Sequence, residues 1–93
     1  MENPIPTVGR IVLYRLNRSD VQTIRERRDT QHIGGNSVNE GDTIPMVIVA
    51  VWSNGPRSAV NGQVLLDGPD GHYWATSVAV GEGPGTFSWP TRT

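Results

Sequence analysis

The segment Thr43–Trp52 constrains the fold of this chain more than any other, because it is apolar at both its odd and its even positions. Its β-branched residues favour an extended strand, in which successive side chains point to opposite faces of a sheet. Both faces of this strand should therefore be covered. One face would enter the hydrophobic core, and the other needs a helix or a partner subunit.

Four further segments favour short strands, and glycine- and proline-containing turns separate them. Within one of these segments, Val60, Val64 and Leu66 should share a face, and the sequence Asp67–Gly71 is typical of a hairpin turn. The predicted strands are Thr7–Tyr14, Val60–Asp67, His72–Val80 and Thr86–Trp89, the last of them a short strand or a 3₁₀ turn.

One helix is predicted over Asp20–Asp29, after the first strand. Ser19 as the N-cap and Gln22 three residues later form a capping-box pattern. The apolar stripe contains only Val21 and Ile24, so the helix must lie across another element. Together these elements predict a mainly β fold with one inserted helix, a small half-open SH3-like barrel of about five strands.

The chain has 93 residues, which predicts a single domain over 1–93 with an N-terminal tail at 1–6 and a flexible loop at 30–42. It contains no cysteine, so neither disulfides nor thiolate metal sites stabilise it. Small chains without such links are natural candidates for homo-oligomers, and we expect one here. The formal net charge of −1 gives no reason to expect general nucleic-acid binding. No apolar run is long enough to cross a membrane, so we expect a soluble intracellular protein.

The sequence contains little that would support catalysis. His32 and His72 have no helix-spaced partner and no recognisable metal-ligand spacing. Ser37 and Ser77 lack the glycine pattern of a nucleophile elbow. We therefore expect a non-enzyme with no cofactor and no metal site.

Two glycine-containing stretches resemble ligand loops but are better explained as turns. The stretch Gly81–Gly85 lacks the lysine of a phosphate-binding loop, and its Pro84 has no N–H to donate. The pair Asp67 and Asp70 lies in a loop too short for an EF-hand, without its distal glutamate.

Arginine supplies all the basic side chains, since lysine is absent. High genomic GC content would explain this bias, and planar guanidinium groups also suit phosphate recognition. Arg25 and Arg28 are neighbours on one helix face, directly before the flexible loop. Two interpretations are open. The two arginines either form a solvated helix face, or they bind a phosphate over which the loop closes.

The aromatic side chains either fill the core or line a site. Tyr73 and Trp74 must point to opposite faces of their strand, so at least one of them leaves the core. Trp52 lies beside the Ser53–Pro56 turn, at the rim of the expected barrel. Nucleobases stack on such rings. The candidate ligand-binding residues are Tyr14, Arg25, Arg28, His32, Trp52, Tyr73, Trp74 and Trp89.

Both ends of the chain carry recognisable phrases, Thr7–Tyr14 with the sequence TVGRIVLY and Gly83–Pro90 with the sequence GPGTFSWP. With the stretch Tyr73–Ser77, they resemble a widespread group of small bacteriophage proteins that open with VGRIVHY and close with GTWHWP. Leu13 replaces the histidine of the opening phrase, while Phe87 and Ser88 replace the tryptophan and histidine of the closing one. The resemblance implies a phage product acting in the cytoplasm of an infected bacterium.

Small phage proteins often counter host defence, which frames three hypotheses. The first is a non-catalytic protein that binds and sequesters a small phosphorylated immune signal, such as a cyclic nucleotide or a cyclic ADP-ribose-type molecule. The second is a protein-binding inhibitor of a host defence protein, which the two-faced apolar strand would serve equally well. The third is a small structural phage component.

Overall fold

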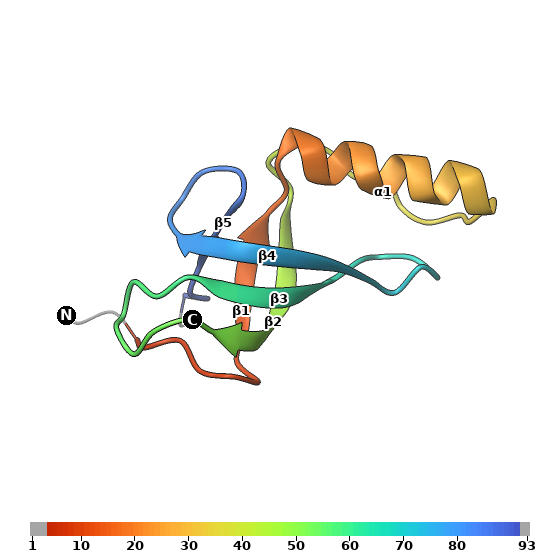
Figure 1. The fold of residues 1–93 in the computed structure, drawn as a ribbon. Helices are drawn as coiled ribbons and strands as arrows, with labels where there is room; N and C mark the ends of the chain where they lie inside the picture. Colours follow the sequence, from red (N-terminus) through yellow and green to blue (C-terminus); the bar gives the residue numbers. More distant parts are fainter. Residues whose placement is uncertain (1–3, 92–93) are drawn as a thin grey trace.

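Five strands and one helix make up residues 4–91, the part of the chain that the computed structural model describes. This confirms the prediction of a mainly β fold with a single helix, compatible with a small SH3-like barrel. None of the described helices is long and apolar enough to cross a membrane. In chain order the elements are β1 (Ile11–Arg15), α1 (Arg18–Gln31), β2 (Thr43–Val51), β3 (Val60–Leu65), β4 (His72–Val80) and β5 (Thr86–Ser88) (Figure 1).

The strands form a closed barrel in the order β1-β2-β3-β4-β5. Neighbouring strands from β1 to β4 pair antiparallel. The short strand β5 closes the barrel because Phe87 lies opposite Tyr14 of β1 and also opposite Val80 of β4, where the pairing is parallel. The barrel is therefore closed where the sequence predicted a half-open one.

The core follows the alternation of the strands. Val12, Met46 and Val64 lie opposite one another on β1, β2 and β3, and all three are fully buried. A Cβ on Gly62 would overlap the Met46 side chain, so β3 leaves room for the methionine by carrying a glycine there. Val60, Val64 and Leu66 are all buried, as their spacing predicts.

Helix α1 begins earlier than predicted, because Asn17 and not Ser19 is the N-cap. The Asn17 side chain accepts the Asp20 N–H at 2.7 Å, and the Asp20 carboxylate accepts the Asn17 N–H at 2.9 Å. This reciprocal pair is a capping box of Asn and Asp, so the Ser19–Gln22 pattern was the wrong one. The helix ends at His32, which adopts the left-handed conformation with φ of 55°.

Backbone hydrogen bonds connect the segment predicted as a flexible loop, which follows α1 in Figure 1, to other parts of the chain. Thr30 and Gln31 still belong to α1. Beyond the helix, Asn36 N–H donates to the Asp67 carbonyl at 3.0 Å, and Gly41 N–H donates to the Leu16 carbonyl at 2.8 Å. Of the predicted N-terminal tail, residues 1–3 lie outside the described residues, and Pro6 is buried.

Candidate functional site

Arg28, the residue expected to grip a phosphate, is held by protein groups. Its Nε donates to Asp70 Oδ2 at 2.8 Å and its Nη2 to Asp70 Oδ1 at 3.3 Å, a two-point ion pair across to the β3–β4 hairpin. Its Nη1 donates to the Asn36 carbonyl at 2.6 Å. The Asp70 side chain is 1% exposed and also accepts from Arg27 at 3.3 Å. The Arg28 hydrogen bond, above all, holds the pKa of Asp70 below its ordinary value.

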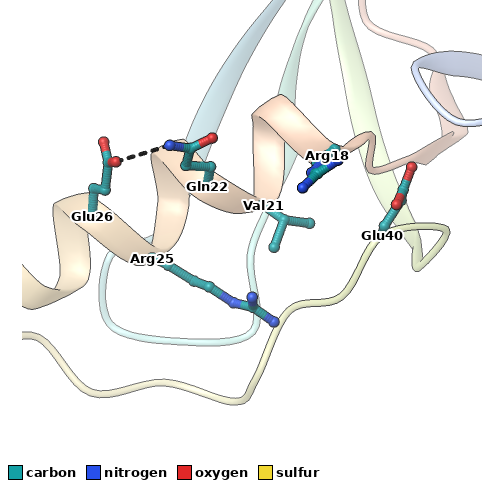
Figure 2. Close-up of a pocket in the computed structure, with 6 residues that line it drawn as sticks. All are labelled: Arg18, Val21, Gln22, Arg25, Glu26 and Glu40. Carbon is teal, nitrogen blue, oxygen red and sulfur yellow. Dashed lines mark hydrogen bonds between the residues drawn. The ribbon is translucent and has the colours of Figure 1, made fainter.

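Arg25 borders a hollow between α1 and the loop that follows it (Figure 2). Its Nη2 crosses to the Val38 carbonyl at 2.7 Å and to Asn39 Oδ1 at 3.3 Å. The hollow has a volume of about 370 Å³, and its charges balance, since it contains two arginines and two glutamates. That balance makes it a poor phosphate site. It is lined by Arg18, Val21, Gln22, Arg25, Glu26 and Glu40.

His32, Tyr14 and Tyr73 have contacts that hold α1 in place. The exposed His32 forms the C-terminal cap of the helix, where its N–H donates to the Asp29 carbonyl at 3.3 Å. Both tyrosine hydroxyls donate to the buried carboxylate of Asp20, that of Tyr73 at 2.7 Å. Burial and the hydrogen bond to Asp20 raise the pKa of Tyr73 to about 12. The same two causes also raise the pKa of Tyr14.

Trp52 and Trp74 are exposed, at 62% and 58% of their surface, but they stand on separate parts of the barrel. Trp52 follows β2, where its N–H donates to the Ala59 carbonyl at 3.1 Å. Trp74 lies in the middle of β4, opposite Gln63 of β3. The eight predicted ligand-binding residues therefore do not gather into one pocket. Their ligand-binding role stays a prediction.

Trp89, the last of these eight, borders the second hollow of the described chain, which has a volume of about 480 Å³. We call it the Trp89 hollow. The Arg10 guanidinium stacks on the indole, with its Cζ 4.9 Å from the ring centroid, and Phe87 meets the ring edge-on. The indole Nε1 is buried and has no hydrogen-bond partner among the described residues. The lining residues are Arg57, Val80, Gly81, Glu82, Ser88 and Trp89.

Three arginines with different contacts lie at or beside the Trp89 hollow. Arg57, from the turn between β2 and β3, has no hydrogen bond or ion pair to another described side chain or backbone group. Arg15 donates to Ser88 Oγ at 3.2 Å and lies 3.9 Å from Glu82, whose side chain is 90% exposed. An exposed pair at that distance contributes little. Arg10 contacts the hollow only through the Trp89 indole on which it stacks. The charged residues that line the hollow itself are Arg57 and Glu82.

The strand pairing explains why residues distant in sequence meet here. Leu13 of β1 lies opposite Ser88 of β5, which brings Arg15 and Arg10 beside the closing segment. The Gly81 N–H donates to the Phe87 carbonyl at 2.9 Å, so the β4–β5 corner folds back onto β5. The sequence identified Trp89 and the glycine corner but missed Arg10 and Arg57. Only the pairing of β1 with β5 could reveal Arg10, and no periodic pattern marks Arg57.

Ser88 Oγ receives an N–H from Arg15, and no histidine lines the hollow. Within residues 4–91, no group of three or more His, Asp or Glu side chains lies close enough together to hold a metal ion. The lining of the hollow thus contains one guanidinium group, from Arg57, one hydroxyl, from Ser88, one carboxylate, from Glu82, and the Trp89 indole.

Comparison of the chain with known proteins found no matching family model, no similar curated protein and no similar solved structure.

Proposed function

We propose that this protein is a non-catalytic binding module that captures a small phosphorylated ligand in the Trp89 hollow. The observation that carries the proposal is that Arg57 lines the hollow, beside the Trp89 indole, without a hydrogen bond or ion pair to another described residue. Two further arginines contact lining residues, Arg10 at Trp89 and Arg15 at Ser88 and Glu82. Arg57 is the donor that a ligand meets without breaking an internal bond.

The properties of the hollow suit a phosphorylated molecule of nucleotide size. Guanidinium groups bind phosphate through paired N–H donors, which gives both strength and orientation. The volume of about 480 Å³ falls within the usual range for small-molecule sites. The stack on Trp89 fixes Arg10 in place, which lowers the conformational entropy that it loses when a phosphate binds.

Such a module would serve as a phage anti-defence protein in the cytoplasm of the infected host. It would sequester a cyclic nucleotide or cyclic ADP-ribose-type immune signal, which requires binding and no catalytic group. Sequestration works by mass action and demands tight affinity, roughly nanomolar or about −12 kcal/mol. The closing phrase that resembles phage proteins contributes Ser88 and Trp89 to the hollow, and Arg10 of the opening phrase stacks on Trp89.

Thermal denaturation with a panel of cyclic nucleotides tests the proposal. At one hundred times its dissociation constant, the bound signal should add about 2.7 kcal/mol to the free energy of unfolding. Arg57→Ala should weaken that ligand at least roughly tenfold in calorimetry, because a charge-assisted hydrogen bond contributes about 1.5–3 kcal/mol. The melting temperature of the free protein should stay nearly unchanged, because Arg57 makes no hydrogen bond or ion pair with another described residue.

Arg18→Ala is the matched control, because this exposed arginine lines the charge-balanced hollow on α1. It should leave ligand affinity unchanged. A flat thermal response across the whole panel would refute the proposal and favour the protein-binding alternative. Equal loss of affinity in both variants would show that the ligand responds to net charge and not to the Trp89 hollow.

A further inference from the structure

The sequence contains asparagine followed by glycine twice, as Asn54-Gly55 and as Asn61-Gly62. This pair is chemically reactive, because the backbone nitrogen of the glycine can attack the side-chain amide carbon of the asparagine and close a five-membered ring. Glycine favours the attack, since it has no side chain to hinder the approach and adopts many backbone conformations. The structure gives the two pairs different surroundings. The first lies in the turn between β2 and β3, and the second lies within β3.

Asn54 is exposed, and its side chain has no hydrogen bond to another residue within 4–91. The Gly55 N–H donates to none of these residues either, whereas the Gly55 carbonyl accepts the Ser58 N–H at 3.1 Å. A Cβ on Gly55 would meet no atom within 4 Å, so no neighbouring group crowds the glycine. The side-chain amide of Asn54 and the nitrogen of Gly55 are therefore both free to react.

Asn61 is followed by the same residue, but the barrel holds it in place. Its Oδ1 accepts the Ser77 N–H at 2.9 Å, where the pairing of β3 with β4 is irregular. Its backbone pairs with Ala50 of β2, and the following Gly62 is buried against the Met46 side chain. Ring closure requires rotation of both the backbone and the side chain of the asparagine, and these contacts fix both. Asn61 can therefore react only when the barrel opens.

We propose that Asn54 is a site of spontaneous deamidation in the folded protein and that Asn61 is protected from this reaction. The Gly55 nitrogen, after losing its proton to hydroxide, attacks Cγ of Asn54. The N–Cγ bond forms, the Cγ–Nδ2 bond breaks and ammonia leaves, so that a succinimide ring remains. Water then opens the ring at either of its carbonyl carbons. The carbon receives the hydroxyl group and the nitrogen regains a hydrogen, which gives aspartate or isoaspartate.

The reaction places a carboxylate in a turn that has no acidic side chain of its own. Among residues 52–59, which connect β2 with β3, Arg57 is the only charged residue. The added negative charge changes the formal net charge of the chain from −1 to −2. The modification rests on observations separate from the Trp89 hollow, so it stands or falls independently of the ligand.

Peptide mapping of the full chain by mass spectrometry tests the proposal. The folded protein is kept at pH 8 for days and is then digested with trypsin, which separates the two sites because it cleaves after Arg57. Fragmentation assigns the mass change from amide to acid to a single residue. Asn54 should react at least roughly tenfold faster than Asn61, which depends on opening of the barrel. In urea, where no barrel protects Asn61, both residues should react at similar rates.

Gly55→Ala should slow the reaction of Asn54 at least roughly tenfold, because the added methyl group hinders the attacking nitrogen. This variant should fold normally, since the position has room for a Cβ. Ser53→Ala, on the other side of Asn54, is the matched control and should leave the rate unchanged. If Asn54 keeps its amide in the folded protein while the chain in urea deamidates, the proposal is overturned. It is also overturned if Asn61 reacts as fast as Asn54 in the folded protein.

Discussion

Asp20 and Asp70 are carboxylates with almost no exposed surface, and the protein satisfies each in a different way. Asp20 accepts two tyrosine hydroxyls and the N–H of Asn17, so neutral donors surround it. Asp70 pairs with Arg27 and Arg28. A buried carboxylate without donors would be strongly destabilising, so these contacts are requirements of the fold.

At this scale, Tyr73→Phe should lower the free energy of unfolding by about 1.5–3 kcal/mol at pH 8, because Asp20 loses a donor. The free energy of unfolding of the wild-type protein should also fall at alkaline pH. Folding raises the pKa of Tyr73 from 10.0 to about 12, so its contribution is complete below pH 10 and is lost as the pH rises toward 12. The variant should lose less stability over that interval. Urea unfolding at pH 8 and pH 11 measures both effects.

Ser19→Ala, an exposed position in the first turn of α1, serves as the control and should change stability little. If Tyr73→Phe is as stable as the wild type at pH 8, Asp20 does not depend on this hydroxyl.

At the scale of the element, two arginines of helix α1 that were expected to bind a ligand instead make contacts within the protein. The sequence places Arg25 and Arg28 on one face, available to a ligand. In the structure these arginines tie the helix to the loop and to the β3–β4 hairpin. A Cβ on Gly35 would lie 2.8 Å from the Arg28 Cζ, so the loop passes close over the guanidinium. The arginines compensate for the narrow apolar stripe of Val21 and Ile24, which alone would hold the helix weakly.

Arg28→Ala should therefore destabilise the protein by roughly 2–4 kcal/mol at neutral pH, because it leaves the buried Asp70 with fewer partners. Arg25→Ala, which removes bonds to the Val38 carbonyl and Asn39 but leaves no buried carboxylate without its partner, should have a smaller effect. The pKa of Asp70 is lowered, so its contribution is present above the ordinary aspartate pKa and is lost as the pH falls through the lowered value. The difference in the free energy of unfolding between Arg28→Ala and the wild-type protein should therefore become smaller in acid.

Denaturant unfolding at pH 7 and pH 3 provides both comparisons. A variant Arg28→Ala as stable as wild type at pH 7 would contradict a structural role and return Arg28 to the list of free phosphate donors.

The closure of the barrel depends on β5, the shortest strand of the described chain. Phe87 lies opposite residues of both β1 and β4, and its side chain is fully buried. The same closure brings Arg10 of the N-terminal segment onto Trp89 and so forms the proposed ligand site. At the scale of the whole molecule, the contacts that close the barrel therefore adjoin the proposed ligand site.

Phe87→Ala should lower the free energy of unfolding by about 3–5 kcal/mol, because it leaves a cavity at the seam of the barrel. Phe87→Leu should lose less stability and stay folded. Its free energy of unfolding can therefore be measured even if the alanine variant does not fold. Trp52→Ala, an exposed aromatic truncation, should change stability by no more than about 0.5 kcal/mol. Denaturant unfolding measures these changes. If Trp52→Ala and Phe87→Ala lower the free energy of unfolding equally, β5 does not hold the barrel closed.

The sequence by itself determined the local structure. The glycine-containing turns on either side predicted the strand His72–Val80 with its bounds as observed. The strand assignment also separated Tyr73 from Trp74, because neighbouring side chains of a strand point to opposite faces. It also predicted one helix, although it chose Ser19 over Asn17, since both residues make good caps and only the backbone path selects between them.

Tertiary structure decided what each charged or aromatic side chain meets. The pairing of β1 with β5 joins residues more than seventy positions apart, as in the bond of Arg15 to Ser88, and no local pattern encodes such a meeting. No local pattern encodes the ion pair of Arg28 with Asp70 or the exposure of Trp74 either. Backbone conformation follows from neighbouring residues, whereas the surroundings of a side chain depend on how the whole barrel closes.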